Sequence, residues 1–312
     1  MMFLQLDFPA MLVALLAALS AALVGNVLVL RRQALMGDAL SHMVLPGVVG
    51  GYILTGDTKS WSMVLGALVA ALTGAGLIVM IRRLGRLDAA TAMGVVLTML
   101  FALGVVMLEL ADASNVHLDI EHALYGSLEA AIWIGPLTWQ EALQPAQWAS
   151  LPREIPMLLA VLAVLAIAMV VAFKEIRLAA FDPDYGAALG LPAWVSELAI
   201  NTAAALAVVA AFDAVGSILV IAMLICPAAS ARLITDRLAA QIYVSLLIAG
   251  TVAIGGYGAA AWAAPAIGLP AALNAAGTIA VTGGVALAIA AGWRAFRRHQ
   301  RRAAEPAPAL NS

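Results

Sequence analysis

Asp38 and His42 are the residues whose types and spacing best suit chemistry. They lie in RRQALMGDALSHMVLPGVVGGYIL, residues 31–54, which begins with two arginines and ends in apolar residues and glycines. Side chains four residues apart share one face of an α-helix, so this carboxylate and imidazole can converge on one point. Such a pair suits Mn²⁺, Fe²⁺ or Zn²⁺. On spacing alone an ordinary role is equally good: Asp38 caps a helix and His42 packs against a backbone carbonyl.

Asp213 is a further candidate ligand. It precedes an apolar run that contains Pro227, in AAFDAVGSILVIAMLICPAASARLIT, residues 210–235. A proline inside a membrane helix frees backbone carbonyls, which then need a partner or a cavity. The sequence leaves the role of Asp213 open.

The composition indicates a membrane protein. Of the 312 residues, 64% are hydrophobic and 11% are charged, and the mean hydropathy is +1.02. Soluble domains average roughly half apolar and a quarter charged residues. Apolar runs of about 20 residues recur, each long enough to cross a bilayer, whereas a transmembrane β-barrel shows short alternating segments. The sequence therefore predicts an all-α, polytopic helical membrane protein.

We expect about nine transmembrane helices. The second is short and contains Pro46, so we expect it to be broken or tilted. The predicted crossings lie at about 10–30, 42–55, 61–81, 90–111, 156–175, 194–212, 215–231, 238–262 and 272–293.

The basic residues predict the orientation. Cytoplasmic loops carry the excess of Lys and Arg. With nine crossings and an external N-terminus, only Lys59 and Arg153 lie outside. The residues then placed in the cytoplasm are Arg31, Arg32, Arg82, Arg83, Arg86, Lys174, Arg177, Arg232, Arg237, Arg294, Arg297, Arg298, Arg301 and Arg302.

Residues 117–135 are moderately apolar, but counting them as a crossing would place nearly all later arginines outside. We therefore expect a short helix at the outer face, followed by an external loop over 136–155. The first residues of this short helix could receive an ion. They could also simply be a solvated helix start, with acids near the helix N-terminus. These four ionisable residues are His117, Asp119, Glu121 and His122.

The chain divides into a transmembrane domain, residues 1–298, and a tail, residues 299–312. The tail is polar and rich in proline and alanine, so we expect it to be disordered in the cytoplasm.

Residues 181–192, FDPDYGAALGLP, predict a short cytoplasmic helix between two crossings. Asp182 followed by Pro183 is typical of a helix start, and Gly190 followed by Pro192 is typical of a helix end. Such a helix could transmit force from a partner, although an ordinary loop helix is the commoner case. No phosphate loop of the form GxxxxGK[ST] occurs, so a nucleotide-driven process would need another chain to bind the nucleotide.

Five sequence blocks, in order, resemble the metal-importing ABC transporter permeases of the zinc, manganese and iron type. The first is RRQALMGDALSHMVLPGV, and the blocks are spread over residues 24–235. The others are RLDAATAMGVVLTMLFALGVVMLE, LDIEHALYGSLEA, FDPDYGAALGLP and VGSILVIAMLICPAASARL.

The resemblance implies the membrane subunit of an ATP-driven importer of Mn²⁺, Zn²⁺ or Fe²⁺, in the bacterial inner membrane. It implies that Asp38 and His42 bind the transported ion, whereas Asp213 matches no family ligand. The implied partners are two cytoplasmic ATPase subunits, a second permease chain, an extracytoplasmic metal-binding protein and membrane lipid. No nucleic acid, permanently bound cofactor or enzymatic activity of this chain is implied. The residues implied to meet the ATPase are Asp182, Tyr185, Gly186, Gly190 and Leu191.

Two other functions compete with this interpretation. In a proton-coupled secondary metal transporter, Asp38 and His42 would relay protons. An intramembrane metal hydrolase is disfavoured because the sequence has no HExxH or paired-aspartate arrangement.

Overall fold

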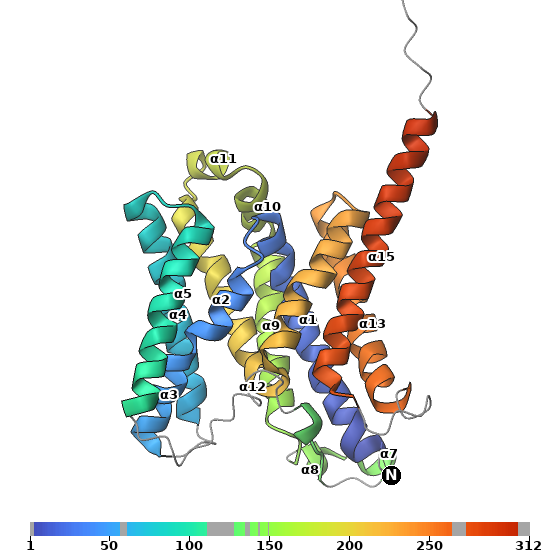
Figure 1. Ribbon diagram of the computed structural model, residues 1–312. Coiled ribbons are helices and arrows are strands. Elements are labelled where there is room, and N and C mark those ends of the chain that lie inside the picture. Colours follow the sequence, from blue (N-terminus) through green and yellow to red (C-terminus); the bar gives the residue numbers. More distant parts are fainter. Residues whose placement is uncertain are drawn as a thin grey trace, which may run out of the picture.

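Helices form every regular element in the part of the chain that the structure describes. The computed structural model describes residues 3–56, 61–110, 128–134, 138–142, 144–148, 150–263 and 273–304. The long helices stand side by side in one bundle, with the first residues at one end and the end of the last helix at the other (Figure 1).

Eight helical stretches among these residues are long and apolar enough to cross a membrane, which confirms the predicted polytopic all-α class. The helices that provide them are α1 (Phe8–Leu30), preceded by the π-helical turn η1 (Phe3–Asp7), α4 (Trp61–Gly85), α5 (Ala89–Leu110), α9 (Glu154–Val171), α12 (Ala193–Ile234), α13 (Leu238–Gly258), extended by η4 (Ala259–Ala263), and α15 (Ala275–Ala304).

The long helix α12 contains two crossings. Its helical backbone is interrupted at Gly216, where φ is 76° and ψ is 166°. A positive φ is readily adopted only by glycine. The two halves, Ala193–Phe212 and Ala214–Ile234, correspond to the predicted crossings at 194–212 and 215–231.

The predicted second crossing, 42–55, is broken in the structure. It is formed by α2 (Met36–Met43) and α3 (Leu45–Thr55), which meet at Val44. Neither helix is long enough to cross alone, but together they lead from mid-height to one end of the bundle (Figure 1). The pair corresponds to the remaining predicted crossing, in addition to the eight long apolar stretches among the described residues.

Two helix ends differ from the predicted boundaries. The predicted crossing 156–175 ends at Val171, and a separate helix, α10 (Phe173–Phe181), follows it. The physical reason is the charged sequence that begins at Lys174, which favours water over lipid. Helix α15 continues to Ala304, beyond the predicted domain boundary at residue 298, so this division of the chain stays a prediction.

Glycines let the helices pack closely, for example in GVVGG at residues 47–51. A Cβ atom built on Gly47 would lie 2.0 Å from the backbone oxygen of Gly66, so α3 and α4 touch through their backbones. A Cβ built on Gly25 would lie 1.9 Å from the backbone oxygen of Leu224, so α1 and α12 do the same. Small residues at such contacts are typical of packed membrane helices.

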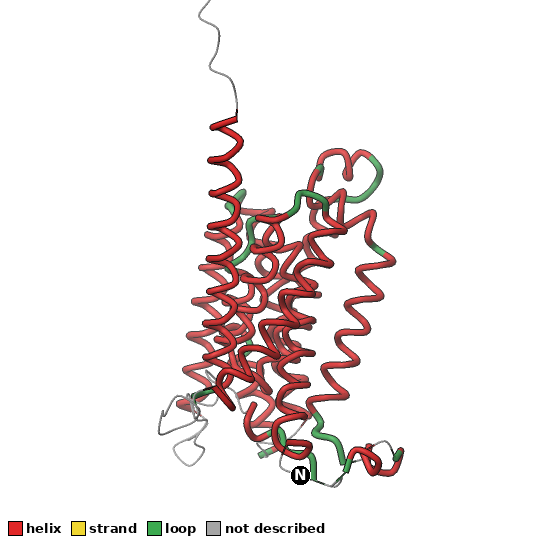
Figure 2. Tube along the Cα trace, turned by 90° about the vertical axis from the view of Figure 1, so that its right-hand side faces the viewer, coloured by secondary structure: helices red, strands yellow, loops and turns green. Residues whose placement is uncertain are grey.

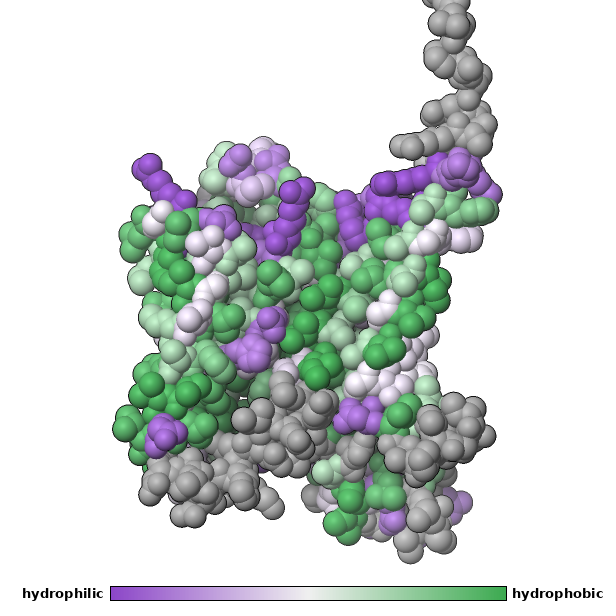
Figure 3. All heavy atoms as spheres, viewed as in Figure 1, coloured by the Kyte–Doolittle hydropathy of each residue, from purple (hydrophilic) through white to green (hydrophobic). Residues whose placement is uncertain are grey.

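Charged side chains gather at one end of the bundle, the upper edge in Figure 3. We call this the basic end: it holds the arginines that follow α1 and α4, the charged part of α10, the loop before α13 and the last turns of α15. Arg153, by contrast, precedes α9 at the opposite end. The charge asymmetry expected from the sequence is therefore present in the folded chain.

Candidate functional site

Asp38 and His42 form an accessible polar pair on α2. The Asp38 Oδ1 and His42 Nε2 atoms are 3.5 Å apart, and the two side chains are 45% and 40% exposed. All six other residues of this eight-residue helix are buried. The predicted convergence on one helix face is therefore present, and that face is the open one.

This open face lies on the surface of the apolar bundle, at about half its height. Helix α2 sits at mid-height in Figure 1, and Figure 3 shows a hydrophilic spot in the same region, surrounded by hydrophobic residues. The ring of Phe101 on α5 stands edge-on to that of His42, with the ring centroids 5.9 Å apart. No Lys or Arg of the described residues forms an ion pair with Asp38.

The pair can offer a carboxylate and an imidazole to a cation, but it is an incomplete site. Among the described residues no group of three His, Cys, Asp or Glu side chains comes close enough to hold a metal ion. Asp38 and His42 can therefore be only part of a coordination sphere that uses four or more ligands.

The other predicted ligand positions are not tested. The backbone of Asp213 lies in α12, three residues before Gly216, but its side chain is not among the described atoms. The four ionisable residues at 117–122 also lie outside the described residues. Trp133, farther along the chain, is buried at the non-basic end, where its backbone N–H donates to the backbone oxygen of Gln5 at 2.9 Å.

The predicted short helix at 182–191 is present as α11 (Pro183–Ala188). Asp182 caps its start, because the Tyr185 backbone N–H donates to the Asp182 Oδ1 atom at 3.0 Å. Gly190 ends it with a φ of 89°. The Leu191 N–H then donates to the Gly186 oxygen at 3.0 Å, which is the bond that defines a Schellman cap. Both sequence signals, the cap followed by proline and the final glycine, are confirmed.

Helix α11 projects beyond the ends of α4, α5 and α9 at the basic end, where α15 reaches farther still (Figures 1 and 2). Gly186 is buried against α10, with Leu178 as the nearest neighbour of its missing side chain. The large side chains of Phe181, Tyr185 and Leu189 are each at least half exposed. The element thus presents apolar surface on a fixed helical support.

Helix α10, which supports α11, was not predicted from the sequence as a separate helix. Helix α10 packs on the bundle through Phe173, Ile176 and Ala179, while Lys174 and Arg177 are exposed. This spacing of three between apolar residues, inside a charged stretch, was the available signal for a surface helix. The predicted crossing 156–175 instead includes the first residues of α10.

Comparison with known proteins agrees with this architecture. The sequence profile of the ABC 3 transport family matches residues 4–132 and 151–276. The chain is 39% identical over 260 residues to the manganese transport system membrane protein MntD of Bacillus subtilis, across 82% of this chain and 85% of that one. It is 35% identical over 216 residues to the zinc transport system membrane protein TroD of Treponema pallidum, across 69% of this chain and 56% of that one.

A solved structure is also similar. The structure described as PsaBC from Streptococcus pneumoniae in complex with Fab superposes with a TM-score of 0.67 at 28% identity. The match covers 90% of this chain and 89% of that one. Because the family profile matches most of the sequence and the fold is shared, the chain belongs to the ABC 3 transport family and is a multi-pass protein of the bacterial cell membrane.

Proposed function

We propose that this chain carries Mn²⁺ or Zn²⁺ across the membrane past Asp38 and His42, driven by ATP hydrolysis in a separate subunit. Its family membership makes it the permease of a metal ABC importer, and this favours ATP-driven import over a proton-coupled mechanism. The observation that carries the proposal is the accessible carboxylate–imidazole pair at mid-height of an apolar bundle.

The identity of the ion rests on chemistry and on the relatives. Carboxylate and imidazole together suit Mn²⁺, Fe²⁺ and Zn²⁺. Two relatives are described as manganese and zinc transport proteins, which favours these two ions over iron. A pair of ligands that is nearly half exposed also suits a transported ion, which must leave again, better than a permanently held one.

A second permease chain would complete the site. Asp38 and His42 face outward from this chain, and a charged side chain facing lipid at this depth is costly. A partner chain placed on this face, related by an approximate two-fold axis, would bring a second pair of ligands to the first. The name PsaBC and the paired names TroC and TroD suit an assembly of two permeases, either identical or paralogous. Asp213 remains a third candidate from this chain.

Helix α11 is the proposed docking element for the ATPase, through the predicted residues Asp182, Tyr185, Gly186, Gly190 and Leu191. The capping bonds of Asp182, Gly186 and Leu191 support a rigid helix. We expect Leu189→Ser, on the exposed apolar surface, to weaken co-purification of the ATPase subunit and to lower transport. Leu54→Ser, at an exposed leucine on α3, is the matched control. Equal ATPase recovery in both variants would exclude α11 as the docking element.

The basic end would face the cytoplasm, because positive charge is retained on that side of bacterial membranes. Helix α11 would then face the cytoplasmic ATPase, and the N-terminal end would face an extracytoplasmic metal-binding protein.

Uptake of radioactive Mn²⁺ and Zn²⁺ by cells that carry Asp38→Asn tests the function directly. We expect uptake to fall to background while the amount of folded permease is unchanged, since the substitution removes a ligand charge and little volume. Asp236→Asn makes the same chemical change at an exposed loop residue and should keep wild-type uptake. Wild-type uptake by the Asp38 variant would rule out this ion path, and uptake without the ATPase subunit would favour the proton-coupled alternative.

A further inference from the structure

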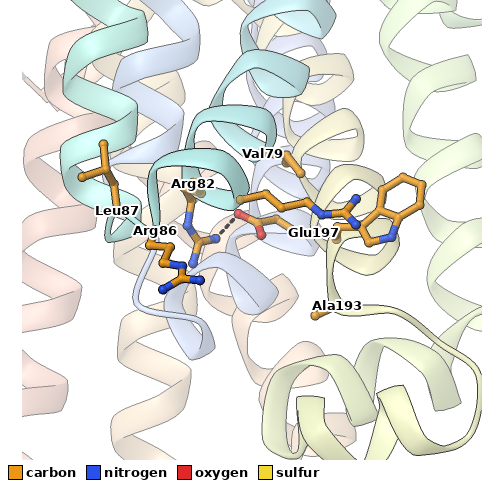
Figure 4. A pocket seen from close by; sticks show the side chains of 8 residues that line it. Val79, Arg82, Arg86, Leu87, Ala193 and Glu197 are labelled. Atoms are coloured by element: carbon orange, nitrogen blue, oxygen red, sulfur yellow. Dashed lines mark hydrogen bonds and ion pairs between the residues drawn. The ribbon is translucent and has the colours of Figure 1, made fainter.

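A pocket at the basic end has no role in the proposed ion path. It lies where the turn between α4 and α5 meets the start of α12, and it encloses about 420 Å³ (Figure 4). Its polar lining consists of Arg82, Arg83, Arg86 and Glu197. The rest of the lining is apolar and includes the half-exposed Trp194.

The charges in this pocket are unbalanced. Arg82 and the nearly buried Glu197 form an ion pair that links α4 to α12 (Figure 4). Arg83 lies over the ring of Trp194, 5.8 Å from its centroid. Among the described residues, no carboxylate forms an ion pair with Arg83 or Arg86. The pocket thus presents three arginines against one glutamate.

Two buried nitrogen atoms nearby also lack acceptors. The Arg82 Nε atom and the Arg31 Nη1 atom are buried without a hydrogen-bond partner. Burial lowers the pKa of Arg31, and Glu197 opposes that effect through its charge. Buried donors normally find an acceptor, so these two groups indicate that an acceptor from outside the chain belongs here.

The backbone also holds one of the three arginines of the pocket in an unusual conformation. Arg86 has a φ of 52°, in the left-handed region that non-glycine residues rarely adopt. The turn that contains it connects α4 to α5 and brings the Arg86 side chain to the pocket lining. Such strain persists where the surroundings or a function maintain it.

The position of the pocket matches the boundary between lipid tails and headgroups. Exposed apolar side chains recur along α4 at helical spacing and end at Leu84, next to Arg83. A bilayer would cover this stripe up to the pocket. Tryptophan is enriched at this boundary, where its ring is apolar and its N–H is polar. The members of the stripe are Trp61, Leu65, Val69, Leu72, Met80 and Leu84.

We propose that this pocket binds the phosphate group of an anionic phospholipid from the leaflet at the basic end. Arginine binds phosphate oxygens through paired, charge-assisted hydrogen bonds, and basic pockets between transmembrane helices recognise anionic headgroups. The glycerol and upper acyl groups would lie against Trp194 and the α4 stripe. The excess of positive charge favours a lipid with net negative charge over a zwitterionic one. The bound lipid would join the α4–α5 turn to the start of α12.

The test measures binding of phosphatidylglycerol and phosphatidylcholine to the full-length permease in detergent, by native mass spectrometry. We expect the double variant Arg83→Gln, Arg86→Gln to bind phosphatidylglycerol at least about 10-fold more weakly, the loss of one charge-assisted contact or more. Arg86→Gln alone should show a smaller loss and keeps the Arg83 contact with Trp194. Arg237→Gln, which removes the same charge at the basic end outside the pocket, should bind as the wild type does.

Three results would overturn the proposal. The first is equal phosphatidylglycerol affinity in the wild type and in the folded Arg86→Gln variant. The second is inorganic phosphate binding as tightly as phosphatidylglycerol, which would assign the pocket to a soluble anion. The third is that the double variant binds phosphatidylglycerol as the wild type does but no longer co-purifies with the ATPase subunit. That result would make these arginines part of a protein interface. Weakening of phosphatidylglycerol binding by salt would further support the electrostatic assignment.

Discussion

Two groups of polar side chains lie within the apolar bundle, and their surroundings are opposite. Asn26 is fully buried: its Nδ2 atom donates to Ser245 Oγ at 2.6 Å, and its Oδ1 atom accepts from Gln241 Nε2 at 3.1 Å. Asp38 and His42 are nearly half exposed and are paired only with each other among the described residues. The first group joins α1 to α13, as hydrogen bonds between membrane helices do. The second is left open for something outside the chain.

The contrast separates polar side chains that stabilise the fold from polar side chains that are available for function. A polar group in a membrane protein is costly unless its hydrogen bonds are made. The Asn26 amide makes them within the chain, so it should serve stability. The Asp38 pair is available to a cation or a partner chain, so it should serve transport.

The largest expected effect is that of His42→Ala on transport. Removing this ligand should lower metal uptake per folded permease by more than about 100-fold. Residues that only orient a metal ligand already cost up to about 100-fold when they are mutated, and a ligand itself should cost more. The melting temperature should stay within a degree or two of the wild type because the side chain is half exposed. Metal uptake with thermal unfolding of the same preparations measures both. A large loss of stability with normal uptake would reverse the roles of the two groups.

Asn26→Ala should have the opposite signature. It removes the partner of Gln241 and Ser245, and unsatisfied buried groups cost about 1–3 kcal/mol. We expect a lower melting temperature but normal uptake per folded molecule. Thr73→Ala is the control, because the Thr73 hydroxyl is exposed and bonds only within its own helix at 2.7 Å. If Asn26→Ala abolishes uptake without destabilising the fold, Asn26 belongs to the ion path.

The smallest effect concerns the buried face of α2. A Cβ atom on Gly37 would lie 2.4 Å from Leu224 Cδ1, the end of a flexible side chain that can move. Gly37→Ala should therefore destabilise the permease by only about 1 kcal/mol, the low end for overpacking. Gly76→Ala, where no atom lies within 4 Å, should be neutral or stabilising. A loss of uptake in the Gly37 variant without a loss of stability would show that α2 must move against α12.

The short helix α11 shows how well local signals predict local structure. Asp182, Pro183 and Gly190 each act on the backbone within a few residues of themselves, so their pattern is sufficient to predict the helix. The neighbouring α10 was not predicted as a separate helix because no helix-breaking residue separates it from the preceding apolar run. The backbone leaves the helix at Ala172, and alanine is not a helix-breaking residue as glycine and proline are.

The sequence by itself determined the membrane class, the long apolar crossings, the asymmetry of charge and the interrupted second crossing. Long apolar runs, arginines at their ends and Pro46 act locally, independent of which helices become neighbours. It also determined that Asp38 and His42 share a helix face, because their spacing matches one helical turn.

Only the tertiary structure decided which polar residues are satisfied. Asn26 forms hydrogen bonds with Ser245 and Gln241, more than 200 residues later, and Arg82 on α4 forms an ion pair with Glu197 on the neighbouring α12. It also decided that the face of α2 with Asp38 and His42 stays open while the opposite face is packed. Such pairings depend on helix order and rotation, which arise from side-chain packing between helices distant in sequence. Spacing along the chain therefore identifies the candidate ligands, and packing separates them from polar residues that only hold helices together.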